Sequence, residues 1–170
     1  MPRFATLPEW LAWQETLHPD KIDLGLERVS AVSARLGLQD MRAALVSVAG
    51  TNGKGSTVAT LCSLLHSLGY RIGSYTTPHI SEYNERVRLG RQVVDDQTLV
   101  NAYEQVEAAR GDTSLSYFEF GTLAAIRILA DHGLDFAVME IGLGGRLDAV
   151  NVLDSDCAVI TPIGLDHQEY

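Results

Sequence analysis

The stretch that decides the fold is Gly50-Thr51-Asn52-Gly53-Lys54-Gly55-Ser56, which stands between an apolar run and a helical pattern. The apolar run, residues 43–49, is typical of a buried strand. Residues 57–68 have the pattern of a helix, and Gly69 is a typical terminator. A glycine-rich turn between a strand and a helix is the context that a phosphate-binding loop needs. The sequence therefore predicts such a loop here.

The residue types of this stretch suit a bound anion. Glycines let backbone N–H groups turn inward, and the start of a helix adds partial positive charge. Lys54 can reach the terminal phosphates of a nucleotide, and Ser56 can place its hydroxyl on Mg²⁺. A tight turn of small residues is the alternative, but it leaves Lys54 and Ser56 unexplained. The residues predicted to bind ATP are Gly50, Thr51, Asn52, Gly53, Lys54, Gly55, Ser56 and Thr57.

Composition limits the class of protein. The 170 residues suit one globular domain, with 46% hydrophobic and 21% charged residues. The net charge of −9 argues against a nucleic-acid surface. Cys62 and Cys157 lie in apolar segments, so we expect small core residues and not a disulfide or metal pair. Without a signal-peptide pattern or an apolar run of membrane-spanning length, we expect a cytoplasmic protein with no membrane partner.

The rest of the chain alternates helical and strand patterns. A capping box begins at Thr6, and Asp23 is a candidate cap of the second helix. Such alternation predicts an α/β fold, a mostly parallel sheet with helices on both faces. The predicted helices span residues 7–17, 23–36, 57–68, 95–109 and 118–130, and the predicted strands span 43–49, 71–76, 136–141 and 157–160, with a polar loop over 77–86 and a hairpin over 85–94. Residues 164–170 resemble a loop that enters a further helix, so we expect the domain to be incomplete.

A carboxylate follows the apolar strand at residues 136–139. In sheets of this type ligands bind beyond the carboxyl ends of the strands, where Glu140 would project. Mg²⁺ prefers oxygen ligands of this kind. An acid that merely ends a strand is the alternative, and the neighbouring phosphate loop favours the metal role.

A glycine-rich stretch, residues 142–148, follows directly. Its three glycines allow a ligand to approach the backbone closely, and Arg146 and Asp148 offer opposite charges to a polar substrate. From composition alone, a flexible loop with a solvated ion pair is the preferred explanation of the stretch.

Five ordered segments resemble the dihydrofolate synthase/folylpolyglutamate synthase family, which is related to the Mur ligases. Mur ligases usually carry Thr at the position of Gly55, whereas the sequence Gly-Lys-Gly-Ser resembles the folate branch. The resemblance runs along essentially the whole chain and is nearest to the bifunctional bacterial form. The segments are residues 22–29, 50–56, 75–87, 139–149 and 161–167.

The resemblance implies a ligase that uses ATP to phosphorylate a carboxylate, after which the amino group of L-glutamate attacks the acyl phosphate. Dihydropteroate and reduced folates would be the acceptors. Residues 1–170 would form the N-terminal part of a Mur-ligase-type ATPase domain, with the C-terminal glutamate-binding domain absent. We therefore expect no turnover by these residues alone, and a monomeric full-length protein.

The resemblance also assigns roles to individual residues. Thr77 stands where the family usually has Ser, and the hydroxyl is retained. Phe118 would stack near the pterin, Asp148 would accept its N–H groups, and His79 has no assigned role and is expected to be solvated. The implied catalytic residues are Lys54, Glu140 and His167; the implied Mg²⁺ ligands are Ser56, Thr77, Glu140 and His167; the implied substrate-binding residues are Leu24, Phe118, Arg146 and Asp148.

Two other functions compete with this one. A Mur-type amino-acid ligase shares the loop and Glu140, but Gly55 and residues 22–29 weigh against it. A nucleotide-binding module without ligase activity is the other possibility.

Overall fold

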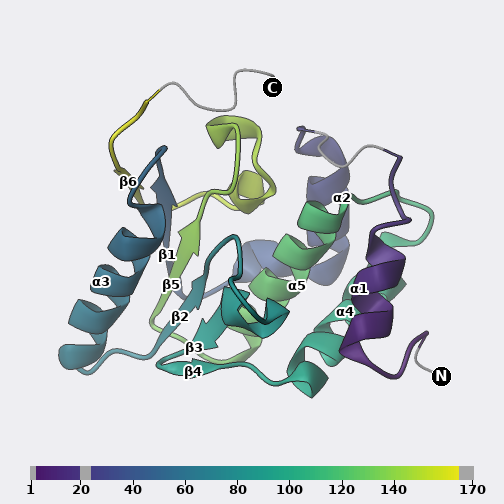
Figure 1. Cartoon of the computed structure of the whole chain (residues 1–170), viewed down its shortest axis with the longest axis horizontal. Helices are drawn as coiled ribbons and strands as arrows, with labels where there is room; N and C mark the ends of the chain where they lie inside the picture. The colour runs from purple at the N-terminus through teal and green to yellow at the C-terminus, as the bar shows by residue number, and fades with distance from the viewer. Residues whose placement is uncertain (1–2, 20–23, 165–170) are drawn as a thin grey trace.

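The computed structural model describes residues 3–19 and 24–164, which form one sheet with helices on both sides (Figure 1). The sheet has six strands in the order β4-β3-β2-β5-β1-β6. Strands β1, β2, β5 and β6 are parallel, and β3 and β4 add an antiparallel hairpin at one edge. The strands are β1 (Ala44–Ala49), β2 (Ile72–Tyr75), β3 (Val87–Leu89), β4 (Gln92–Val93), β5 (Phe136–Glu140) and β6 (Cys157–Ile160).

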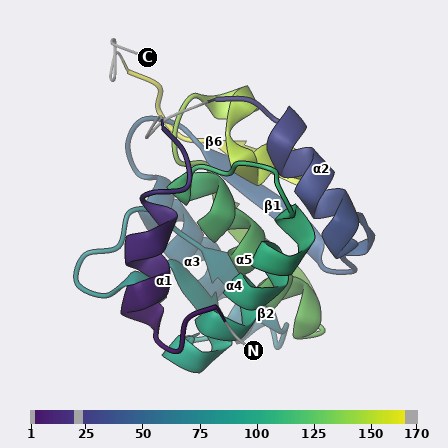
Figure 2. The same cartoon turned by 90° about the vertical axis from the view of Figure 1, so that its right-hand side faces the viewer.

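The helices divide unequally between the two faces of the sheet. Helix α3 (Lys54–Ser67) covers one face, where Val58 packs on Val48, Ile72 and Val138. The other four helices lie together on the opposite face, as Figure 2 shows. They are α1 (Leu7–Gln14), α2 (Glu27–Leu36), α4 (Asp96–Arg110) and α5 (Tyr117–Asp131). The predicted α/β class, with a mostly parallel sheet covered on both faces, is confirmed.

Helix α5 is the central helix of the larger layer. Ser116 caps it: its Oγ accepts from the N–H of Glu119 at 3.3 Å, while the Glu119 carboxylate accepts from the N–H of Ser116 at 2.7 Å. This reciprocal pair is a capping box and fixes where the helix begins. Along the helix, one long run of small and aliphatic residues is buried. A helix that is apolar on most sides needs cover on most sides, which the sheet and the helices around it supply.

Strand register brings three functional segments to one edge. Val48 of β1 pairs with Glu140 of β5, and Ala49 of β1 pairs with Ile160 of β6. Because these strands are parallel, their carboxyl ends lie side by side. The loop after β1, the carboxylate that ends β5 and the segment after β6 therefore meet.

Several predicted boundaries differ from the structure. Helix α3 begins at Lys54 and not at Thr57, because Gly53 takes the N-cap position with φ 84° and Lys54 is already helical. Helix α1 ends at Gln14, before the predicted residue 17. Helix α2 begins at Glu27, and its predicted cap, Asp23, lies outside the described residues.

Two predictions about individual segments are wrong. Residues 77–86 were expected to be a polar loop, but Tyr83–Arg86 forms a 3-10 helix and both of its terminal residues are buried. Gly121 makes room for this turn, since a β-carbon there would lie 2.3 Å from the Tyr83 hydroxyl. Cys157 is an exposed residue of β6 and not a core residue, whereas Cys62 is half-buried; both are free thiols.

The close packing of β2 against α5 generates a stability prediction. A β-carbon at Gly73 would lie 2.3 Å from Leu129 Cδ2 and 2.5 Å from Leu134 Cδ1. Gly73→Ala should therefore lower the free energy of unfolding by roughly 1–3 kcal/mol in urea titrations. Gly164→Ala is the matched control, because a β-carbon there meets nothing within 4 Å. Equal stabilities for the two variants would contradict the packing at Gly73.

Candidate functional site

The predicted phosphate loop joins β1 to α3 with a sharply bent backbone. Gly50 has φ 130° and Gly53 has φ 84°, both in the region that favours glycine. A β-carbon at Gly50 would lie 2.0 Å from Thr161 Oγ1 and 2.8 Å from the Thr161 carbonyl oxygen. The loop thus begins in direct contact with the segment after β6, and only glycine fits at that contact.

Hydrogen bonds hold the loop to the same segment. The N–H of Thr51 donates to the Pro162 carbonyl at 3.1 Å. The Thr51 hydroxyl donates to the Gly164 carbonyl at 3.2 Å and accepts from the Gly164 N–H at 3.0 Å. The Thr161 hydroxyl donates to the Ala49 carbonyl at 3.1 Å. These four hydrogen bonds between protein groups fix the position of the loop relative to the segment after β6.

Lys54 lies at the mouth of the loop. Its ammonium donates to the carbonyls of Gly50 at 2.8 Å and Thr51 at 3.2 Å. Within residues 3–19 and 24–164, no ion pair includes Lys54. An ammonium group that contacts carbonyls at the start of a helix is well placed to bind an anion. This arrangement fits the phosphates of a nucleotide.

Glu140 ends β5 beside the first turn of α3. The residue is 4% exposed, and its carboxylate accepts from the N–H of Thr77 at 3.3 Å. Burial raises the pKa of Glu140, while the Thr77 N–H and the charge of Lys54 oppose that rise. A β-carbon at Gly55 would lie 3.7 Å from Glu140 Oε2, so the glycine lets the helix start come close to the carboxylate.

The chemistry of these groups fits a hard cation. A buried carboxylate gains from a neighbouring positive charge, and the hydroxyls of Thr77 and Ser56 are oxygen donors on the adjoining segments. The described residues hold no group of three or more His, Cys, Asp and Glu side chains that could bind a metal. A cation here would thus need hydroxyl, water or phosphate ligands as well. His167 lies outside the described residues.

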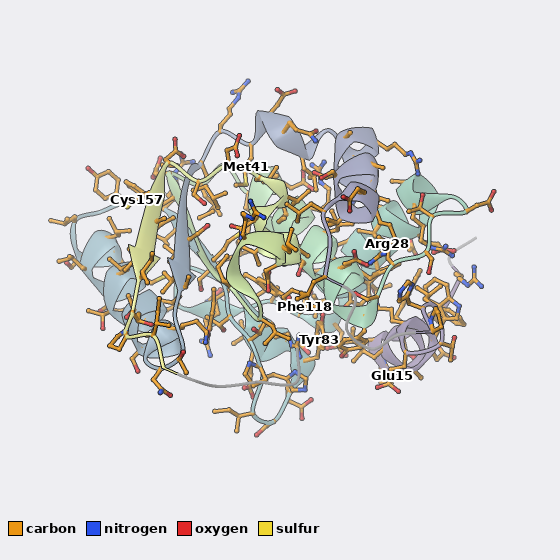
Figure 3. The ribbon with its side chains drawn as sticks, turned by 90° about the horizontal axis from the view of Figure 1, so that it is seen from above. Glu15, Arg28, Met41, Tyr83, Phe118 and Cys157 are labelled. Carbon is orange, nitrogen blue, oxygen red and sulfur yellow. The ribbon has the colours of Figure 1, made fainter. Side chains whose placement is uncertain are left out.

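A cavity of about 260 Å³ contains three of the four predicted substrate residues, Leu24, Phe118 and Asp148. Thr77 and Arg86 also line it. Phe118 lies between the sheet, marked by Cys157, and α1, marked by Glu15 (Figure 3). The fourth predicted residue, Arg146, is exposed and lines a separate cavity of about 580 Å³ together with Lys54 and the loop glycine Gly50.

Asp148 is the buried carboxyl group of the smaller cavity. It is 1% exposed and accepts from the N–H groups of Leu143 at 2.8 Å and Val150 at 2.9 Å. Burial raises the pKa of Asp148 from 3.8 to about 6, although these N–H groups stabilise the charged form. A carboxyl group in this setting is a strong acceptor for N–H groups of a ligand.

The glycine-rich turn after β5 packs tightly around this carboxyl group. A β-carbon at Gly142 would lie 2.8 Å from the ring of Phe118 and 3.2 Å from Asp148 Oδ2. One at Gly144 would lie 2.8 Å from Leu24 Cδ1. The turn is thus a close-packed wall of the cavity, and the alternative of a flexible loop with a solvated ion pair is wrong for Asp148.

Arg86 is a site residue to which sequence reasoning assigned no role. It is 9% exposed, lines the smaller cavity, and donates through Nε to His79 Nδ1 at 2.9 Å. His79 is half-buried, so the expectation of a solvated loop histidine is wrong. The only sequence signal was a position within the segment that resembles the family's substrate loop, because nothing local distinguishes a buried arginine from an exposed one.

The features of this site together define the class of protein. A glycine-rich loop with a lysine links a parallel strand to a helix, and a buried carboxylate ends the neighbouring strand. The chain has the α/β fold and the loop of a P-loop nucleotide-binding domain.

Comparison with known proteins identifies the family. The chain is 49% identical over 164 residues to the dihydrofolate synthase/folylpolyglutamate synthase of Escherichia coli K12, covering 96% of this chain and 39% of that protein. It is 42% identical over 164 residues to the protein of the same name from Haemophilus influenzae, covering 96% of this chain and 37% of that protein. No family model matches the chain.

Solved structures agree. Escherichia coli FolC in complex with DHPP and ADP superposes with a TM-score of 0.96 at 48% identity, covering 98% of this chain and 40% of that one. Thermotoga maritima folylpolyglutamate synthase gives a TM-score of 0.83 at 35% identity, and the match covers 93% of this chain and 39% of that one. The chain belongs to the dihydrofolate synthase/folylpolyglutamate synthase family and spans about two fifths of the length of the relatives it matches. Within the described ranges, no helix is long and apolar enough to cross a membrane.

The raised pKa of Asp148 generates a prediction about pH. In the folded state the carboxyl group of Asp148 has a pKa of about 6, whereas the ordinary pKa of an aspartate is 3.8. Between these two pH values the folded state therefore binds more protons than the unfolded state. The free energy of unfolding should therefore fall by roughly 3 kcal/mol from this group as pH rises from below 4 to 7. Urea titrations across this range should show a flatter dependence for Asp148→Asn.

Asp112→Asn is the matched control, since Asp112 is an exposed carboxylate that does not line the cavity. It should leave the pH dependence of unfolding as in the wild type. If Asp148→Asn behaved like this control, the carboxyl group of Asp148 would not be desolvated in solution.

Proposed function

We propose that this chain supplies the ATP-binding part of a ligase that joins L-glutamate to the carboxylate of dihydropteroate or a reduced folate. The observation that carries the proposal is the cavity of Asp148 and Phe118, which extends to Thr77 beside the carboxylate of Glu140. A ligand seated there would present one end to the phosphate loop. Residues 1–170 would be the N-terminal part of the ATP-binding domain, and the glutamate-binding domain would belong to the rest of the full-length protein.

The first chemical step would be phosphoryl transfer. The acceptor carboxylate attacks the γ-phosphorus of ATP, a new O–P bond forms, and ADP leaves with the electrons of the broken bond. Such a transfer needs charge neutralisation and positioning more than covalent help. Lys54 would leave the carbonyls of Gly50 and Thr51 for the β- and γ-phosphates, and the loop N–H groups would bind the phosphate oxygens.

Mg²⁺ would neutralise the charge that gathers on the transferred group. The chain's candidate ligands are Ser56, Thr77, Glu140 and His167. Among the described ones, the buried carboxylate of Glu140 would gain most from the cation, because burial already disfavours its charged form.

The second step would be attack by the amino group of glutamate on the acyl carbon, with release of phosphate. In the smaller cavity, Asp148 would accept N–H groups of the pterin, Phe118 would face its ring and Leu24 would cover its apolar edge. Arg146, in the cavity shared with Lys54, would bind a substrate carboxylate. The relatives support these substrates, since one solved structure has Mn, AMPPNP and L-glutamate bound. We also propose a cytoplasmic location and a monomeric full-length protein.

The nucleotide part of the proposal is tested with one lysine. Lys54→Met should weaken binding of a Mg·ATP analogue at least about tenfold in calorimetric titration, because a charge-assisted contact to phosphate is lost. Arg42→Met removes the same charge from an exposed position at the far end of β1 and should bind as tightly as the wild type. Equal affinities for both variants would remove Lys54 from the nucleotide site.

The substrate part is tested with dihydropteroate. The chain should bind it, and Asp148→Asn should weaken binding roughly tenfold or more, because an amide replaces one acceptor oxygen with a donor. Asp112→Asn should have no effect. Nucleotide binding without any dihydropteroate binding would favour a nucleotide-binding module, and binding of a nucleotide-linked peptide in its place would favour a Mur-type ligase.

A further inference from the structure

Arg86 is a buried cation without a buried anion beside it. Its side chain is 9% exposed, and no ion pair within residues 3–19 and 24–164 includes it. Its guanidinium carbon lies 4.8 Å from the ring centre of Tyr83 and 5.9 Å from that of Tyr117. Aromatic faces attract a cation, but they do not carry a compensating charge.

The hydrogen-bond partners that the structure shows for the Arg86 side chain are an imidazole and a phenol. His79 accepts from Nε–H of Arg86 through Nδ1 at 2.9 Å. The hydroxyl of Tyr75 is a further partner. Burial raises the pKa values of Tyr75, Tyr83 and Tyr117, which keeps these phenols protonated at neutral pH. Among the described residues Arg86 is thus a buried cation that forms no ion pair, and an anionic ligand would recover part of the free energy that its burial costs.

Arg86 and Thr77 line the same cavity. The Arg86 carbonyl accepts from the N–H of Thr76 at 2.9 Å, and the next residue, Thr77, donates its N–H to Glu140, so the backbone of Arg86 is tied to the segment beside that carboxylate. Asp148 lines the same cavity but comes from the turn after β5, and the two opposite charges form no ion pair with each other. The cavity thus offers a carboxylate to one part of a ligand and a guanidinium to another.

We propose that Arg86 binds the carboxylate of the acceptor substrate and positions it for phosphorylation. This inference rests on the function proposed above. Dihydropteroate has N–H groups on its ring, which suit Asp148, and its single anionic group is the carboxylate at the opposite end. With the ring at Asp148, that carboxylate extends toward Thr77 and Arg86. The planar guanidinium matches a carboxylate with two parallel N–H donors, and His79 and the tyrosine rings hold its orientation.

The test compares two ligands that differ only at the proposed contact. They are dihydropteroate and its carboxamide analogue, in which a neutral amide replaces the carboxylate. Calorimetric titrations would use the wild-type chain, Arg86→Met, and the control Arg88→Met. Arg88 is an exposed arginine on the adjacent strand β3 and does not line this cavity, so its removal changes net charge equally.

Arg86→Met should weaken dihydropteroate binding roughly 10- to 100-fold, the usual range for a hydrogen bond to a charged group. It should change binding of the carboxamide less than about threefold, because the amide makes little use of the guanidinium charge. The wild type should therefore prefer the carboxylate, and Arg86→Met should lose that preference. Arg88→Met should keep it.

The ratio of the two affinities also separates a binding role from a structural one. If Arg86 only orders residues 79–86, both ligands weaken together, the ratio stays at its wild-type value, and the inference is overturned. Arg86→Gln, a neutral variant that still donates hydrogen bonds, gives the same ratio test should the methionine variant not fold. If the wild type binds neither ligand, the proposed substrate is wrong. If it binds dihydropteroate in an Asp148-dependent manner with an unchanged ratio in the Arg86 variants, this inference alone fails.

Discussion

The parallel pairing of β1 with β5 and β6 is the interaction on which the site depends. Parallel strands end at the same edge, so the loop after β1, Glu140 and Thr161 become neighbours although they are far apart in the chain. The contact between Gly50 and Thr161 leaves no space for a side chain, which makes the geometry of the loop a consequence of the sheet. Helix α3 then begins where this edge ends and directs its first turn at Glu140.

Local patterns predicted the features that are encoded locally. The glycine-rich stretch 50–56 predicts its own turn, because positive φ angles require glycine at Gly50 and Gly53 and the flanking residues have clear strand and helix periods. Glu140 was predictable as well, since a single carboxylate after an apolar strand must lie at the ligand-binding edge of such a sheet. The helix α4 follows from its cap, Asp95, whose carboxylate accepts from the N–H of Thr98.

Features set by distant packing were not predictable. Arg86 and His79 lie in a mostly polar stretch, and the turn that contains Arg86 packs through Tyr83 against Gly121, in a helix that comes later in the chain. The separation of Arg146 from Asp148 has the same origin: the two residues are neighbours in sequence, but the turn after β5 directs them into different cavities. Periodicity and composition describe neighbours along the chain, whereas these positions depend on contacts between separate elements.

The hydrogen bonds between Thr51 and residues 162–164 have a mechanical consequence. They join the nucleotide loop to the segment that leaves the sheet after β6, so neither can move far without displacing the other. A nucleotide bound at the loop would therefore also favour one position of residues 162–164, and a change that shifts these residues would alter nucleotide affinity by the same factor. The loop would then act as a sensor of how the polypeptide beyond the sheet is arranged.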